Sequence, residues 1–185
     1  RPPWTCLGTQ GGLPGLWANT STLLHWGDWR LPPSVDLCGL LEFVERGPTS
    51  SGGVLHLGGD TVAGQNRLTI YYSPNSYRIL LSDGSSSVAS VATVQPSSGQ
   101  IVRLRWRLRL AGGLHYVRIW QSINDGAEVA ATESSGLTAI TSYGTNPKLR
   151  LNSIGTGNQS AVEYRGGVIA RGDLPLERLL EALNP

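Results

Sequence analysis

The most regular pattern of apolar and polar residues along the chain runs from Ile101 to Leu110. Every second residue there is apolar, and the residues between them are Arg103, Arg105, Arg107 and Arg109. Successive side chains of a β-strand point to opposite faces, so the alternation predicts a strand with one face in the core and a row of arginines outside. In a helix the same arginines would lie all around the axis.

Shorter apolar runs, separated by turn-forming residues, predict further strands. They cover residues 37–44, 54–57, 67–72, 77–81, 88–94, 114–121, 148–154 and 161–170. Ser73-Pro74-Asn75-Ser76 and Asn124-Asp125-Gly126 have the residues of hairpin turns. The 24 glycines and 11 prolines are spread between the runs, as in proteins built from many short strands. The 185 residues suit one β-sandwich domain better than two domains.

The two ends of the chain differ from this pattern. Asp173 and Pro175 precede leucines at helical spacing, which predicts a short C-terminal helix that plugs the sandwich, caps an edge or docks on a partner. Residues 1–34 have no periodicity and are rich in proline and tryptophan. We expect them to form an arm whose tryptophans pack on a sandwich edge or on a neighbouring subunit. The folded domain would then span residues 35–185.

Several segments match a succession of degenerate motifs. Tyr116–Trp120 followed by Asp125-Gly126 looks like an "L-x-L-Y-V-D-G" strand and turn, Lys148–Gly155 like "L-x-I-G", and Tyr164–Ala170 like "F-x-G-x-I-x-x-V". Trp106 stands in a "W-H-x-V/L" stretch, although the histidine is missing. Over residues 36–183 this order resembles the concanavalin A-like and laminin G-like jelly rolls. The resemblance implies an all-β fold, a two-sheet antiparallel jelly-roll sandwich with a short C-terminal helix.

The same resemblance implies binding of glycans or protein partners, at a concave face or along loop tips. Such modules are frequent in bacteriophage virion proteins, as receptor-binding, fibre or decoration parts. Some members hold a calcium ion between loops. No calcium ligand set can be matched here, because Asp60, Asp83 and Asp125 lack an identifying spacing and suit a role as turn formers. We therefore expect no cofactor other than calcium, which the resemblance leaves open.

The net charge and the make-up of the basic residues limit the classes of partner. The formal net charge is only +2, which argues against a nucleic-acid ligand, since phosphate binding usually accompanies a larger positive charge. Lys148 is the one lysine beside fourteen arginines. Arginine suits interfaces and contacts with carboxylate or sulfate, although an arginine-rich codon bias explains the same count. No run of 18 apolar residues is present, so we expect no membrane span.

The arginine row is the candidate ligand-binding site. Four guanidinium groups on one sheet face repel one another and need acids or an anionic ligand opposite them. One interpretation pairs them with Glu and Asp of adjacent strands. The other is a surface for acidic or sulfated sugars, or for a carboxylate-rich protein, which an exposed tryptophan would extend by stacking on a sugar ring. The residues assigned to this site are Arg103, Arg105, Arg107, Arg109, Arg118 and Trp120.

Catalytic and metal chemistry have little support. The hydrolases of this fold carry clustered carboxylates on one strand, whereas the odd separation of Glu42 and Glu45 places them on opposite faces of a regular strand. His25, His56 and His115 are not at metal-binding spacing. Cys6 and Cys38 would form a disulfide if the N-terminal arm lay along the strand of Cys38, and otherwise are two unrelated thiols.

We therefore expect a non-enzymatic binding module of an extracellular or virion (bacteriophage) assembly, attached to a surface glycan or protein receptor. The alternative is a purely structural capsid decoration or tail protein that joins subunits through its N-terminal arm. Other subunits of the assembly, including further copies of the chain, are expected partners in both cases.

Overall fold

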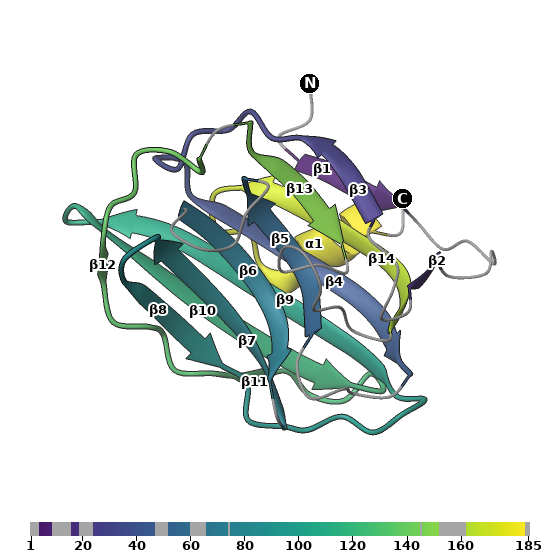
Figure 1. The fold of residues 1–185 in the computed structure, drawn as a ribbon. Coiled ribbons are helices and arrows are strands. Elements are labelled where there is room, and N and C mark those ends of the chain that lie inside the picture. The colour runs from purple at the N-terminus through teal and green to yellow at the C-terminus, as the bar shows by residue number, and fades with distance from the viewer. Residues whose placement is uncertain are drawn as a thin grey trace.

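A computed structural model describes residues 4–8, 16–18, 24–46, 52–59, 66–73, 75–144, 146–151 and 162–183. Its strands form two layers (Figure 1). Sheet A contains β1 (Trp4–Gly8), β2 (Leu16–Ala18), β4 (Leu37–Glu45), β9 (Ile101–Ala111), β10 (Leu114–Ile123), β11 (Val129–Ala130), β12 (Leu137–Thr138) and β14 (Val162–Arg171). Sheet B contains β3 (Leu24–Asp28), β5 (Gly52–Gly58), β6 (Asn66–Ser73), β7 (Ser76–Asp83), β8 (Ser87–Val91) and β13 (Lys148–Leu151).

The strand order confirms the predicted antiparallel sandwich. Sheet A runs β1-β14-β4-β9-β10-β11, with β12 pairing β10 and β2 pairing β14, and sheet B runs β3-β13-β5-β6-β7-β8. Non-consecutive neighbours such as β4 beside β14 and β9 show that the chain crosses between the layers, as in a jelly roll. Two tight turns match their sequence signals, because Gly112 and Gly113 have φ values of 57° and 75°, and Asn124 and Asp125 have φ values of 51° and 59°.

The predicted alternation in β9 is confirmed. Val102, Leu104, Trp106 and Leu108 are buried in the core between the sheets, and the arginines are half-buried on the outer face of sheet A. Trp106 lies opposite Gly39 of β4, and a Cβ atom on that glycine would lie 2.6 Å from the Cε2 atom of the indole. The missing side chain of Gly39 is therefore what gives the largest core residue its space.

The C-terminal helix α1 (Leu176–Leu183) is confirmed as an element, but it neither plugs the sandwich nor caps an edge. Leu179 and Leu183 form a second apolar cluster with Cys38 and Leu40 of β4 and with Val168 and Ala170 of β14. These strand residues point away from the main core, so α1 covers the outer face of sheet A over β4 and β14. Both faces of this part of sheet A are consequently buried.

The N-terminal segment contributes strands to both layers. β1 and β2 pair with β14 at one edge of sheet A, and β3 pairs with β13 at one edge of sheet B. The boundary between an arm (1–34) and a domain (35–185) stays a prediction, although the described pieces of the arm belong to the sheets. The side chains of Trp4, Trp17 and Trp26, residue Asp60 and residues 152–154 of one predicted strand lie outside the described part of the structure.

Candidate ligand-binding face

The outer face of sheet A brings the predicted arginines together. Arg103, Arg105, Arg107 and Arg109 lie along β9, and the neighbouring strand β10 presents Tyr116, Arg118 and Trp120 on the same face. Val117 and Ile119 of β10 point into the core, as predicted. Two strands therefore carry all six residues of the predicted site side by side.

Carboxylates pair with the arginines of β9. Arg105 pairs with Glu128 (Nη2–Oε2 2.6 Å), Arg109 with Glu133 (Nη2–Oε2 2.6 Å), and Arg107 with both Glu133 and Asp173. At the end of the row, Arg103 contacts Glu42 and Asp125. The ion-pair interpretation of the row is thus the one seen in the structure.

The electrostatic effect is clearest at Glu133. Its pKa falls from 4.5 to about 2, chiefly because Arg109 donates hydrogen bonds to the carboxylate and secondly because Arg107 does so, against the opposing effect of partial burial. Glu133 is therefore ionised at neutral pH, and it holds two guanidinium groups that would otherwise repel each other. This stretch of the face has little excess charge.

Arg118 differs from the arginines of β9. Its Nε donates to the carbonyl of Ala131 at 2.9 Å, and it forms no ion pair in the described part of the chain. Arg118 also lies opposite Arg107 on the adjacent strand, an arrangement of like charges that costs free energy. No carboxylate of the described residues contacts its terminal amino groups, whereas each arginine of β9 has at least one carboxylate partner.

Trp120 lies among three guanidinium groups. The Cζ atoms of Arg105, Arg118 and Arg107 are 3.8, 5.0 and 5.7 Å from the centroid of its ring, close enough for cation–π interactions. Trp120 is half-buried and not the freely exposed ring that the sequence suggested, because Arg105 covers it. The arrangement fixes the indole beside the donors of Arg118.

Other sequence candidates have structural roles. Both glutamates are buried, but Glu42 contacts Arg103 and Arg165 on the outer face of sheet A, whereas Glu45 lies on the core side and accepts a hydrogen bond from the Tyr77 hydroxyl. The two glutamates therefore lie on opposite faces of β4, as predicted. His56 contacts Thr69 Oγ1 and the Gly59 carbonyl, and burial lowers its pKa from 6.5 to about 4. The described residues contain no group of three His, Cys, Asp or Glu side chains that could hold a metal ion.

The candidate disulfide is not formed, because Cys38 is a free, buried thiol. Burial is the main reason why the pKa of this thiol is raised. Cys6 pairs in register with Val168 of β14, and Cys38 pairs with Ala170 on the other side of the same strand. Two strand spacings are about 9.5 Å, beyond the roughly 7 Å between Cα atoms that a disulfide can bridge. The arm runs along β14 and not along β4.

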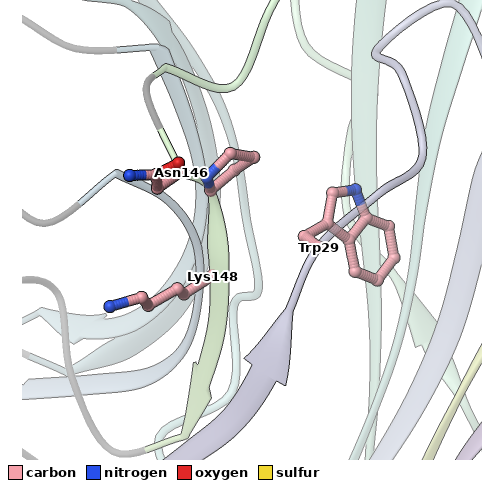
Figure 2. A pocket seen from close by; sticks show the side chains of 4 residues that line it. Trp29, Asn146 and Lys148 are labelled. Carbon is pink, nitrogen blue, oxygen red and sulfur yellow. The ribbon is translucent and has the colours of Figure 1, made fainter.

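A pocket of about 410 Å³ lies at Trp29, Asn146, Pro147 and Lys148. Figure 2 shows the side chains of Asn146 and Lys148 pointing away from Trp29. Trp29 packs against the main core instead. Because the polar groups do not converge, this pocket is a weaker candidate for a ligand than the face of sheet A.

Sequence reasoning missed the acids that complete the face. Glu128 and Glu133 flank β11 in a stretch without strand periodicity, and Asp173, expected only as a helix cap, contacts Arg107. The spacing of Glu128 and Glu133 carried no signal, since their positions depend on how residues 127–136 fold back along β10. No helix in the described part of the chain has the length and apolar character needed to cross a membrane.

Comparisons with known proteins identify the fold. Neither a family model nor a curated protein matches the chain. Among solved structures, domains LG4-5 of the mouse laminin α1 chain are 12% identical with a TM-score of 0.54, and the match covers 91% of this chain and 44% of that one. The CBM40 of the Ruminococcus gnavus IT-sialidase, bound to α2,3-sialyllactose, is 13% identical with a TM-score of 0.56. This match covers 96% of this chain and 100% of that one.

The enzymatically active domain of tailspike protein 2 from bacteriophage CBA120 is a third similar structure. It is 12% identical with a TM-score of 0.60, and the match covers 100% of this chain and 31% of that one. The chain thus spans less than half of the laminin and tailspike chains. At these identities the likeness concerns the fold, and the two-sheet order with its terminal helix agrees with it. The chain has the concanavalin A-like, laminin G-like jelly-roll fold.

Proposed function

We propose that this chain is a non-catalytic glycan-binding module of an extracellular or virion assembly. Its ligand is an acidic sugar, bound on the outer face of sheet A. The observation that carries the proposal is the pair Arg118 and Trp120, an arginine without a carboxylate partner in the described residues and 5.0 Å from the centroid of a fixed indole. The sialyllactose-bound module of similar fold supports the ligand class.

The two side chains provide complementary contacts. The terminal amino groups of Arg118 can donate two parallel hydrogen bonds to a sugar carboxylate or sulfate. The part of the Trp120 indole that Arg105 leaves uncovered offers apolar surface to the ring of the same sugar. Both residues are fixed before a ligand arrives, Arg118 by the Ala131 carbonyl and Trp120 by Arg105, so little side-chain entropy is lost on binding.

The four arginines of β9 lie beside this site and can contribute secondary contacts to a ligand. Each already has a carboxylate partner, so an anionic ligand would compete with Glu128, Glu133 or Asp173 for Arg105, Arg107 or Arg109. The carboxylates that pair with these arginines also make the face nearly neutral. A nearly neutral face favours recognition of one acidic group over general attraction to polyanions.

Binding to an array of neutral, sialylated, uronated and sulfated glycans tests the proposal. We expect the wild-type chain to bind acidic glycans, and Arg118→Ala and Trp120→Ala each to weaken that binding at least tenfold, since each removes a direct contact. Arg178→Ala is the matched control, because Arg178 is exposed on α1 and pairs with Glu181. Equal binding by wild type and both site variants, or binding to neutral glycans only, would contradict the proposal.

A purely structural role is the second candidate function, as a decoration or tail protein that joins subunits through its N-terminal segment. The internal pairing of the β9 arginines favours it, since these residues need no external ligand. In that case the array would show no binding. Cross-linking within the native assembly would instead place residues 1–34 at a subunit contact.

A further inference from the structure

Two exposed valines lie on the outermost strands of the two sheets. Among the described residues the exposed large apolar side chains are Val91 and Val94, each 37% exposed, and Val129, 44% exposed. Val91 ends β8, the last strand of sheet B, and Val129 begins β11, the last strand of sheet A. The Ser90 hydroxyl donates to the Thr132 carbonyl at 2.7 Å, which ties β8 to the segment after β11. Figure 1 shows β8 at the rim of its layer.

The backbone of β8 has an unpaired edge. Ala92 N–H donates to the Tyr77 carbonyl at 2.9 Å, and Ile79 pairs in register with Ser90 and Leu81 with Val88. Hydrogen-bonded pairs alternate along antiparallel strands, so the backbone groups of residues 88, 90 and 92 face β7. Those of Ser87, Ala89 and Val91 therefore face away from the sheet, and all three residues are exposed.

This edge lacks the features that normally prevent strand pairing. Soluble proteins protect edge strands with charged side chains, proline or bulges. Residues 84–102 contain no charged residue, and the first proline after β8 is Pro96. The register between β7 and β8 is continuous from Ser82 to Arg78. β8 is thus a regular, uncharged strand with one side open.

We propose that β8 pairs with β8 of a second copy of this chain, antiparallel about a two-fold axis at Ala89. In this register Ala89 faces Ala89 of the second copy, and Val91 faces Ser87. The three facing pairs exchange about six backbone hydrogen bonds, and sheet B continues through both copies. Val91 lies along the seam.

The chemistry of the strand favours a second copy as the occupant. A two-fold interface places the same patch on both subunits, so a charged residue near the axis would lie opposite the same charge of the second copy. β8 has no such charge, and alanine at the axis leaves room for the facing chain. A partner of opposite charge would have nothing on this strand to recognise.

Sedimentation velocity of the full chain over a hundredfold concentration range tests this pairing. We expect a dimer for the wild type. Ala89→Lys and Ala89→Glu each place like charges face to face, so each variant alone should be monomeric, with the dissociation constant of the dimer raised at least tenfold. An equimolar mixture of the two variants should again dimerise, because the introduced ammonium group then faces the introduced carboxylate.

Thr138→Lys on β12 is the control for added charge at an exposed strand position, and it should sediment as the wild type does. Circular dichroism of each variant checks that the fold is retained. A monomeric wild type at every concentration, dimers of the Ala89→Lys variant alone, or a mixture that stays monomeric would each overturn the proposal. Glycan binding is measured separately, so failure here leaves the Arg118 and Trp120 site untouched.

Discussion

Replacing Glu133 by glutamine should remove the central ion pairs of sheet A. Glu133 accepts hydrogen bonds from Arg109 at 2.6 and 3.0 Å and from Arg107 at 2.9 Å. The fall of its pKa from 4.5 to about 2 corresponds to roughly 3 kcal/mol of stabilisation. Because the side chain is 24% exposed, screening by water reduces the expected loss for Glu133→Gln to about 1–2 kcal/mol at pH 7.

The lowered pKa of Glu133 also predicts how the stability difference between wild type and Glu133→Gln changes with pH. A carboxyl with a lowered pKa stabilises the fold fully above its unfolded value of 4.5, and this contribution is lost as the pH falls from 4.5 towards 2. Urea unfolding followed by tryptophan fluorescence should show the variant less stable at pH 7 and the two proteins converging near pH 2. Equal stability at pH 7, or a difference that persists at pH 2, would refute the reasoning. Glu181→Gln, in an exposed helix pair, is the control and should change stability by less than about 0.5 kcal/mol.

Three further predictions concern His56, Gly39 and Glu128. Burial lowers the pKa of His56 to about 4, so protonation of His56 destabilises the fold. The free energy of unfolding should therefore fall by roughly 3 kcal/mol between pH 6.5 and 4. Urea unfolding of wild type and His56→Gln at several pH values checks this, and the same fall of the unfolding free energy with pH in both proteins would contradict it. Gly39→Ala places a Cβ atom 2.6 Å from Trp106 and should cost about 1–3 kcal/mol by overpacking. The cost of Gly39→Ala should be smaller in a Trp106→Leu background, because the clash is then removed. An unchanged melting temperature of the single variant would refute the contact. Glu128→Gln frees Arg105 and should strengthen binding of acidic glycans severalfold by calorimetry, whereas weaker binding would show that the ion pair organises the site.

The alternation of apolar and polar residues predicted the strands well where one face is buried and the other is exposed to solvent. Arg103 to Arg109 alternate with core residues, so a one-residue error in register would bury every guanidinium. Residues 37–41 carry a second signal, a continuous apolar run, which is typical of a strand covered on both faces. That run anticipates the helix over β4, although only the fold shows that α1 is the element covering Cys38 and Leu40.

The site was only half predictable. The arginines and Trp120 follow from strand periodicity, and their common face follows from the hairpin at Gly112 and Gly113. Their partners Glu128 and Glu133 come from a segment whose path is set by tertiary contacts, such as the Ala131 amide donating to the Ile119 carbonyl at 2.9 Å. No local sequence rule gives such a path, so the difference between Arg118 and the paired arginines became visible only in three dimensions.

The central claim is that acidic glycans bind beside Trp120 and Arg118. A ¹H–¹⁵N spectrum resolves the indole N–H signals of the six tryptophans, and Trp120→Phe assigns one of them. On titration with the best ligand from the array, we predict that the Trp120 indole and the Arg118 guanidinium signals shift together and saturate with one affinity. Shifts confined to other tryptophans, with the Trp120 signal unmoved at saturation, would contradict the account.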